Sequence, residues 1–339
     1  MIRIAISEIK EWELIQKCHL EYFKKYVTPR INNISYKKGT LESLMKKFID
    51  NIVLSDIAIG KISSLKSCLI EYDQILASMA VGCSAKTYKK RIEKINNTLK
   101  YIFNYESFRD NKNNIEIDHK PMNWNRHKLI SLMDIRTCPY CNRQYVTNYT
   151  EIDNKKTTAD LDHFYPQSKY PFLALSLYNF IPCCQVCNSR FKGDRFEAEK
   201  HIYPYDEEFG DDAKFTIKSE TMDYIWDSLS NFEIELSVQK ECKNVEKIKN
   251  SINTFKIEKV YQTHKDYAQE IIKKAIVYDK QMIKDLVIQY PDMFKSEDEV
   301  WQCVMANYMT DENLGNRPLA KLTKDICEQF GIKVKSSSF

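Results

Sequence analysis

The chain has 339 residues, which exceeds the usual size of one domain, so we expect two or three packed units with a sizeable apolar core. Its formal net charge of +4 neither requires nor excludes a polyanionic partner. Eleven cysteines without a secretion signal favour reduced thiols and metal ligands over disulfides, and no apolar run approaches the roughly 20 residues that span a bilayer. The sequence therefore predicts a soluble, cytoplasmic protein that does not enter a membrane.

Residues 1–136 are predicted to form an α-helical domain, because apolar side chains recur there at helix-compatible spacing. Residues 62–81 fill one of the expected helices. Ser7, Thr40 and Ser84 are predicted N-caps, since a side-chain oxygen at that position can accept a hydrogen bond from a backbone N–H of the first helical turn. The N-terminal part is therefore interpreted as an α-helical domain.

Residues 206–339 are predicted to be mainly helical as well. The stretch 255–290 contains no glycine or proline and predicts a helix longer than the average of about 11 residues, with room for one break. Ser296, three residues before a glutamate, matches a capping box. Pro318 and Gly331 mark the expected start and end of a last helix.

Between these parts, residues 137–205 lose the helical period and mix cysteine, proline, asparagine and aromatic residues. This module contains two C-x-x-C pairs, formed by Cys138, Cys141, Cys184 and Cys187. Each pair can present two thiolates to one tetrahedral ion, so the sequence predicts a closed, structural zinc site. One such pair alone would equally suit a redox pair or two core cysteines. The neighbouring Cys183 is interpreted as a spare, buried thiol.

Polar residues suited to phosphodiester hydrolysis lie between the two pairs and just after the second. His163 can be the base that deprotonates water, and Asp162 and Asn188 can hold a divalent cation beside the phosphate. Mg²⁺ and Mn²⁺ both accept oxygen ligands, and Mg²⁺ needs only one or two of them from the protein. Asp160 is a second acid on the same strand, and a surface position is expected for it.

The order and spacing of these residues resemble the zinc-stapled form of the HNH, or ββα-metal, nuclease family, in the pattern Asp162-His163-x-x-Pro166, Asn179 and Cys184-x-x-Cys187-Asn188. The resemblance covers residues 137–195 and implies a strand-strand-helix core. It implies that His163 is the general base, that Asn179 ties the loop between the strands, and that Asn188 binds metal. It also implies products with 5′-phosphate and 3′-hydroxyl ends.

One position departs from the family pattern, because Asn188 stands where the family name expects histidine. This variant resembles the HNH domain of CRISPR RNA-guided nucleases and leaves the metal preference open, but not the reaction. The surroundings of the motif, including Pro139, Lys169-Tyr-Pro171 and the run up to Lys192, resemble HNH proteins encoded beside ATPases in bacterial anti-phage systems, Septu-like ones among them. That second resemblance implies an antiviral defence role and an ATPase partner.

Basic residues offer further contacts to nucleic acid. Arg190 and Lys192 are predicted to face incoming phosphates, with a solvated helix face as the alternative. The clusters at 86–94 and 126–128 can follow a nucleic-acid backbone, but ordinary solvated faces are the interpretation we favour for them.

The predicted fold class is mainly α with a small α+β module: an α-helical N-terminal domain at 1–136, a zinc-stapled ββα HNH module at 137–205, and a mainly helical C-terminal region at 206–339. The predicted function is a metal-dependent endonuclease with Zn²⁺ for structure and Mg²⁺ or Mn²⁺ for catalysis. DNA is the favoured substrate by family habit, and RNA is the alternative, since no 2′-hydroxyl reader is evident. A non-catalytic zinc ribbon that binds nucleic acid or protein is the alternative from another functional class.

Overall fold

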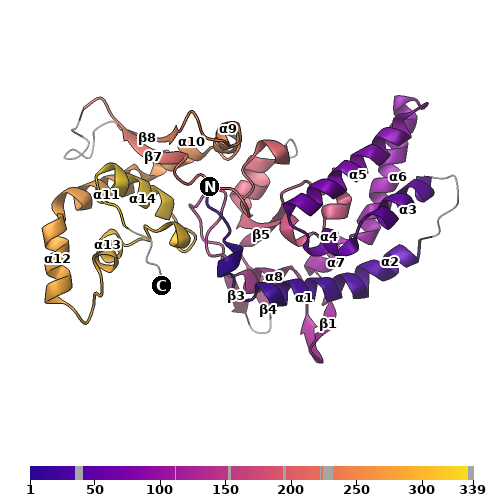
Figure 1. The fold of residues 1–339 in the computed structure, drawn as a ribbon, viewed down its shortest axis with the longest axis horizontal. Coiled ribbons are helices and arrows are strands. Elements are labelled where there is room, and N and C mark those ends of the chain that lie inside the picture. The colour runs from indigo at the N-terminus through magenta and orange to yellow at the C-terminus, as the bar shows by residue number, and fades with distance from the viewer. Residues whose placement is uncertain are drawn as a thin grey trace. The chain divides into compact units, whose positions relative to one another are not determined.

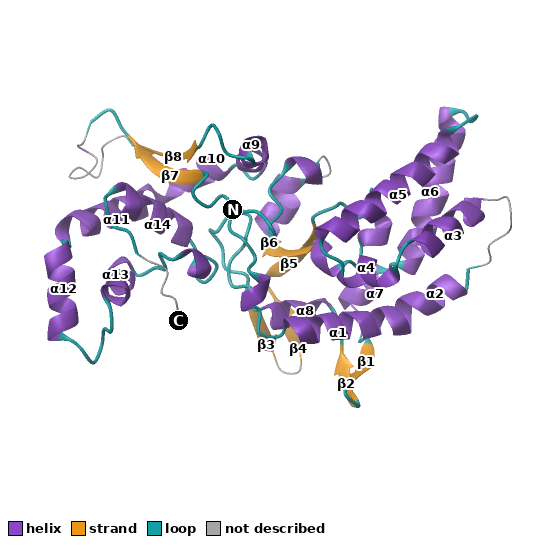
Figure 2. Ribbon diagram, viewed as in Figure 1, coloured by secondary structure: helices purple, strands orange, loops and turns teal. Residues whose placement is uncertain are grey.

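The computed structural model describes residues 1–34, 41–110, 112–151, 154–193, 196–221, 223 and 232–334. Across these residues the elements are mainly helices, and the strands form four two-stranded sheets (Figure 2). The predicted mainly helical fold class is therefore confirmed. No helix in the described ranges is both long and apolar enough to cross a membrane. The chain divides into two compact units, and each unit is assembled from separated segments.

The first unit comprises residues 6–134 and 148–182, and we call it the His163 unit. Among its described residues, seven α-helices precede the first strand, and α8 lies between the β1–β2 hairpin and β3 (Figure 1). The elements are η1 (Ile6–Glu8), α1 (Trp12–Tyr22), the π-helix η2 (Phe23–Val27), α2 (Thr28–Asn32), α3 (Leu41–Asn51), α4 (Leu54–Ile59), α5 (Ile62–Ala80), α6 (Ala85–Ile102), α7 (Tyr105–Asp110), β1 (Asn114–Ile117), β2 (Lys120–Asn123), α8 (Arg126–Met133), β3 (Asn148–Glu151), β4 (Asn154–Thr157), β5 (Ala159–His163), η3 (Pro171–Leu173), η4 (Leu177–Asn179) and the start of β6 (Phe180–Cys184).

The segment between β5 and β6 lies in the core of the His163 unit. The short helices η3 and η4 are fully buried there. Phe172 of η3 packs between Phe48 of α3 and Tyr72 of α5, with ring centroids 5.1 and 4.9 Å away. Aromatic rings bury large apolar areas and favour such tilted and edge contacts. The helices of this unit thus form a shell around the segment that follows the predicted catalytic strand.

Several predicted helix signals in this unit can be compared with the structure. The helix expected over 62–81 is α5, and Ser84 caps α6 by accepting a hydrogen bond from Thr87 N at 3.3 Å. Ser7 is not a cap, because the chain forms the short η1 turn there and α1 begins only after Glu11. Thr40 lies outside the described residues.

A β-hairpin lies within the region that was predicted to be an α-helical domain. β1 and β2 pair antiparallel, with Ile117 opposite Lys120. The two residues of the turn, Asp118 and His119, have φ values of 50° and 61°. Two-residue turns of this type usually contain glycine or asparagine, so the sequence lacks the usual hairpin signal. The sequence therefore did not predict this hairpin within the helical region.

The second unit comprises residues 1–5, 135–147 and 183–339, and we call it the cysteine unit. It contains one hairpin and a run of helices towards the C-terminus. Its elements are the end of β6, the π-helix η5 (Val186–Lys192), η6 (Ala198–Lys200), β7 (Ala213–Lys218), β8 (Glu233–Val238), α9 (Val245–Thr254), α10 (Ile257–Tyr261), η8 (Gln262–His264), α11 (Lys265–Val277), α12 (Lys280–Gln289), α13 (Glu297–Met305), η9 (Asp311–Asn313) and α14 (Ala320–Gln329).

The helix boundaries predicted near the C-terminus agree with the structure at Ser296 and Gly331 but not within 255–290. The stretch 255–290 is broken more than once, because Lys256 adopts a left-handed φ of 52° and Asp279 caps a new helix by accepting from Met282 N. Ser296 caps α13 as expected. Gly331 ends α14 with a φ of 84°, which is a conformation that glycine adopts at little cost.

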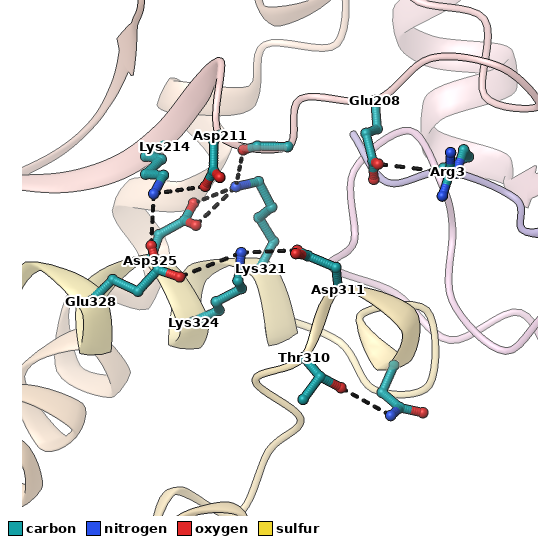
Figure 3. Close-up of polar contacts among 12 residues, drawn as sticks. Arg3, Glu208, Asp211, Lys214, Thr310, Asp311, Lys321, Lys324, Asp325 and Glu328 are labelled. Atoms are coloured by element: carbon teal, nitrogen blue, oxygen red, sulfur yellow. Dashed lines mark hydrogen bonds and ion pairs between the residues drawn. The ribbon is translucent and has the colours of Figure 1, made fainter. Parts of the chain in front are cut away.

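A network of lysines and carboxylates joins α14 to β7 within the cysteine unit (Figure 3). The Lys321 and Asp325 side chains are 2% and 0% exposed, and Lys321 Nζ donates to both Asp325 oxygens at 2.8 Å. Lys321 also donates to Gly210 O, and Asp325 accepts from Phe215 N, each at 2.9 Å. The two buried charges are thus paired and hydrogen-bonded, which is the condition that makes burial of an ion pair tolerable.

Replacing Lys321 with methionine is expected to lower the free energy of unfolding by about 3–5 kcal/mol, because the Asp325 carboxylate then stays buried without its partner. Urea unfolding measures the change. Lys321→Met combined with Asp325→Leu should recover part of the loss. Lys218→Met, which removes an exposed ion pair with Glu235, is the matched control and should leave the midpoint nearly unchanged. A Lys321→Met protein as stable as wild type would contradict this account.

Candidate metal centre and histidine site

Cys138 and Cys141 lie in a tight turn of the cysteine unit. Asn142 N donates to Cys138 O at 2.8 Å, and the φ of Asn142 is 49°. Asparagine is one of the few non-glycine residues that adopt this left-handed conformation readily. The next backbone N–H, that of Arg143, points to Cys141 Sγ at 3.4 Å. The turn therefore reverses the chain around the sulfurs of the first pair.

The second pair completes a cluster of four sulfurs. Cys184 ends β6, and Cys187 lies in η5. All four Sγ atoms lie within 4.8 Å of one another, and those of Cys141 and Cys184 are 4.0 Å apart. Tetrahedral zinc with Zn–S bonds of about 2.3 Å places its sulfurs roughly 3.8 Å apart. The cluster is therefore compatible with a structural zinc site, and Cys183 is not part of it.

The crowding of four sulfurs shifts their pKa values in opposite directions. Hydrogen bonds from the neighbouring thiols lower the pKa of Cys184, and the thiol of Cys138 does the same for Cys141. Burial raises the pKa of Cys138, and hydrogen bonding to the other sulfurs raises that of Cys187. Two of the four thiols thus resist ionisation in the absence of positive charge. A divalent cation would supply that charge and release the remaining protons.

Tyr261 and Asn142 tie the cluster to the rest of the cysteine unit. Tyr261 Oη donates to Cys141 O at 2.7 Å. Asn142 Oδ1 accepts from Lys321 N at 3.0 Å, and Asn142 Nδ2 donates to Leu314 O at 2.9 Å. One buried asparagine therefore forms the turn of the first cysteine pair and also holds the start of α14. Loss of the cluster is expected to loosen this helix.

His163 ends β5 in the His163 unit, with 8% of its surface exposed. Its Nε2 lies 2.9 Å from Ala174 O. Because a carbonyl oxygen only accepts, Nε2 carries the proton in the neutral ring, and Nδ1 keeps the lone pair. The ring packs edge-on against Tyr105, at 4.6 Å between centroids, and against Phe180 at 5.3 Å. The ring orientation and the identity of the basic nitrogen are thus both defined.

Asn179 holds the loop that receives the His163 hydrogen bond. Its Oδ1 accepts from Tyr165 N at 2.7 Å, and its Nδ2 donates to Tyr165 O at 3.1 Å and to Leu173 O at 3.0 Å. The side chain is fully buried. These bonds link Tyr165, which lies just after β5, to Leu173, which lies just before Ala174. Asn179 therefore joins both ends of the stretch whose carbonyl orients the His163 ring.

A second buried histidine supports the same loop. His19 of α1 is 0% exposed, and its Nε2 donates to Leu175 O at 2.6 Å. Trp124 Nε1 donates to His19 Nδ1 at 3.1 Å, which fixes the tautomer of His19. Two consecutive carbonyls, of Ala174 and Leu175, are thus held by two histidines from distant parts of the chain. Both carbonyls need such partners, because buried backbone groups are costly without hydrogen bonds.

Positive charge lies close to the ring that covers His163. Burial raises the pKa of Tyr105 to about 12, and the guanidinium groups of Arg126 and Arg109 oppose the rise. Asp160 is also near enough to act on this hydroxyl, and it is half-buried rather than on the surface as expected. Arg126 Nε is buried and has no hydrogen-bond partner among the described residues. This part of the unit could accept an anionic group.

The remaining predicted site residues are divided between the two units. Asp162, on β5, is 5% exposed and belongs to the His163 unit. Asn188, Arg190 and Lys192 lie on η5 in the cysteine unit. The joint binding of one cation by Asp162 and Asn188 therefore stays a prediction. Arg190 is exposed, whereas Lys192 is 7% exposed with its Nζ 4.5 Å from the Phe196 ring centroid.

No protein-family model, curated protein or solved structure matches this chain. The functional conclusion therefore rests on the residues themselves. Sequence reasoning missed His19 and Tyr105, which come from helices far upstream of the module. Neither residue stands at a spacing from the motif that could have indicated its role, because only the folded chain brings it to the loop.

Substituting Cys141 with serine is expected to lower bound zinc from about one ion per chain to well below it and to lower the thermal midpoint, since structural zinc contributes free energy of folding. Metal analysis and thermal unfolding of the same sample measure both effects. Cys183→Ser is the matched control, because Cys183 is buried beside the cluster but outside it. The control should keep its zinc. Wild-type protein that carries no zinc would count against the site.

Burial gives His19 a defined effect on the pH dependence of stability. It lowers the pKa of this ring from 6.5 to about 4. As the pH falls through this window, the unfolded chain gains a proton at His19 before the folded protein does, so stability decreases. The shift corresponds to roughly 3 kcal/mol.

Urea unfolding between about pH 7 and pH 4 tests this effect. The decrease in unfolding free energy is expected to be shallower in His19→Phe than in wild type, whatever the absolute stability of the variant. Identical slopes for the two proteins would show that His19 is not the titrating group.

Proposed function

We propose that this protein is a metal-dependent endonuclease of the HNH type that hydrolyses phosphodiester bonds of nucleic acid, with DNA favoured as the substrate. The observation that carries the proposal is the state of His163, a buried ring whose Nε2 is bonded to Ala174 O and whose Nδ1 is therefore the basic atom. The four-cysteine cluster supports it, because the cysteines flank the segment that carries His163. A ββα core of β5, β6 and η5 is part of the proposal.

His163 is the proposed general base. Its Nδ1 accepts a proton from water while the water oxygen attacks phosphorus, and the bond from phosphorus to the 3′ oxygen breaks. The products carry a 5′-phosphate and a 3′-hydroxyl, and the 3′ oxygen takes its proton from solvent. The hydrogen bond from Nε2 to Ala174 O becomes stronger once the ring is charged, so the loop stabilises the protonated base. Asn179 is the proposed positioning residue for that loop.

Asp162 and Asn188 are the proposed ligands of a catalytic Mg²⁺ or Mn²⁺, since their side-chain oxygens suit hard cations. When bound, the cation neutralises charge on the phosphate and on the leaving oxygen. Asp162 stands beside the base on β5, whereas Asn188 enters from the sequence pattern alone. The zinc is proposed to be structural only, because four thiolates leave no ligand position open.

The substrate class is supported by charge near His163. Arg126 and Arg109 act on Tyr105, whose ring packs against His163. Guanidinium groups bind phosphate oxygens well because they offer several N–H donors in a planar fork. Arg190 of η5 is exposed and is a further proposed phosphate contact, whereas Lys192 would first have to leave the Phe196 ring.

An ATPase partner and a cytoplasmic role in antiviral defence belong to the same proposal and come from the resemblance of the motif surroundings. A site that recognises only a phosphodiester cannot distinguish foreign from host nucleic acid. External control is therefore needed, and a partner that hydrolyses ATP could provide it. Co-expression with the product of the neighbouring gene, followed by purification through one tagged chain, tests the association.

His163→Ala is expected to reduce plasmid cleavage by about 10²- to 10⁴-fold, which is the usual contribution of a general base. Cleavage in Mg²⁺ or Mn²⁺ is followed by gel, with the protein alone and with any co-purifying partner. His119→Ala is the matched control, because His119 lies in the same unit with an almost fully exposed side chain.

The control should cleave like wild type, and removal of the divalent cation should stop cleavage in both. Equal cleavage by His163→Ala and wild type would refute the mechanism. The same assay with an RNA substrate decides between the two nucleic acids.

A further inference from the structure

α6 has a larger net positive charge than the rest of the chain. Its residues, Ala85–Ile102, include six basic side chains and one acidic side chain, a formal net charge of +5. The whole chain has a net charge of only +4. The remainder of the protein is thus close to neutral, and α6 is a local source of positive potential in the His163 unit.

The basic side chains lie on the solvent side of the helix. Ile95, Leu99 and Ile102 are buried and form the side that packs on the unit. Five exposed lysines occupy the opposite side, and we call them the α6 basic face: Lys86, Lys89, Lys90, Lys94 and Lys100. At 100° per residue, Lys86, Lys90 and Lys94 form one row along this face.

Arg91, the sixth basic residue, has a structural role. Its Nη1 donates to Met79 O near the end of α5 at 3.0 Å. Tyr72 of α5 also donates to Asn96 of α6, at 2.7 Å. These bonds hold α6 against α5, and the two helices run side by side (Figure 1). The α6 basic face is therefore carried on a braced helix rather than on a loose one.

This charge arrangement has a cost in the protein alone. Like charges at i,i+4 spacing repel one another and destabilise a helix. Within the described part of the chain, no carboxylate forms an ion pair with Lys86, Lys89, Lys90 or Lys100. The single acid of the helix, Glu93, cannot neutralise these four lysines. An ordinary solvated helix face mixes both signs, whereas this face suits a polyanion.

We propose that the α6 basic face binds the phosphate backbone of a nucleic-acid duplex and so holds the substrate of the nuclease. This inference rests on the proposed function for the identity of the substrate. The α6 basic face from Lys86 to Lys100 is about 21 Å long at 1.5 Å per residue. Successive phosphates of one strand are spaced about 3.4 Å along the duplex axis and wind around it, so the straight face meets only some of the roughly six phosphates within that length.

A duplex fits this face better than a single strand does. Proteins that bind single strands place aromatic rings among the basic residues, so that the bases can stack. On α6, whose residues are all described, Tyr101 is the one ring that is largely exposed, at 51%. Lysines without stacking partners contact phosphates and not bases, so the binding is independent of sequence. Such contacts add affinity and a strong dependence on salt.

The test uses a protein in which four lysines of the face, Lys86, Lys89, Lys90 and Lys94, are replaced with glutamine on a His163→Ala background. Binding to a DNA duplex of about 30 base pairs is measured by fluorescence anisotropy over a range of salt concentrations. Each lost phosphate contact lowers the slope of log K against log salt by about 0.9. We expect the slope to fall by about 3 and the affinity to fall at least tenfold at moderate salt.

The matched control replaces four exposed lysines of the cysteine unit with glutamine: Lys240, Lys243, Lys280 and Lys284. It changes the net charge equally and should shift the slope by less than about 1. Equal slopes for the α6 variant and the control would overturn the inference. Tighter binding of the parent His163→Ala protein to a single strand than to the duplex would also overturn it. The melting temperature of the α6 variant should equal or exceed that of its parent, because the repulsion is relieved.

A cleavage assay separates this inference from the proposed function. With His163 intact, the α6 variant should cleave bis(p-nitrophenyl) phosphate as wild type does, because this small substrate has no extended phosphate backbone for the lysines to bind. Its KM for plasmid should rise while kcat stays unchanged. If His163→Ala still cleaves DNA, the proposed base is wrong, but the salt slopes still decide whether α6 binds the duplex.

Discussion

The convergence of four sulfurs is the constraint on which the course of the chain depends. The two cysteine pairs are 43 residues apart, yet their Sγ atoms lie within 4.8 Å of one another. The chain leaves the cysteine unit after the first pair and returns with the second, and residues 148–182 in between belong to the His163 unit. The entropy cost of closing a loop rises only slowly with its length. Bonds from one metal ion to four thiolates can therefore hold the two ends of this long segment together. Weaker contacts could do so only if there were many of them.

Within the His163 unit, the demands of burial define the state of the proposed base. The loop after β5 is buried, so its carbonyls must find donors. His163 and His19 supply them at Ala174 and Leu175. His19 Nδ1 also accepts from Trp124 Nε1, which only a neutral ring can do, and burial keeps the ring neutral by lowering its pKa to about 4. The same requirement places the proton of His163 on Nε2 and leaves Nδ1 as the base. The hydrogen bond from His163 Nε2 to Ala174 O thus both satisfies a buried carbonyl and leaves Nδ1 as the proposed base.

What the sequence predicted correctly depends on contacts within a few residues. The C-x-x-C pairs, the Ser84 cap and the Gly331 stop each act through atoms at most five positions away. The hairpin at Asp118 escaped prediction because its turn lacks the glycine that usually marks a two-residue hairpin. His19 escaped for a different reason, since its partners lie 105 and 156 positions away. Local signals carry no information about such pairs, so the sequence pointed to His163 and Asn179 but not to His19.

The charge of this protein also differs between the local scale of one helix and the sum over the chain. A net charge of +4 predicts almost nothing about partners, because the total combines a strongly basic helix with a remainder close to neutral. Screening makes the local value the relevant one, since charges more than about 10 Å apart interact weakly at moderate salt. The five lysines of the α6 basic face lie on a single side of one helix, where neighbours one turn apart are well inside this distance. Opposite charges elsewhere on the chain cannot cancel their potential. A polyanion that approaches α6 therefore meets a strongly basic surface, although the protein as a whole is only weakly basic.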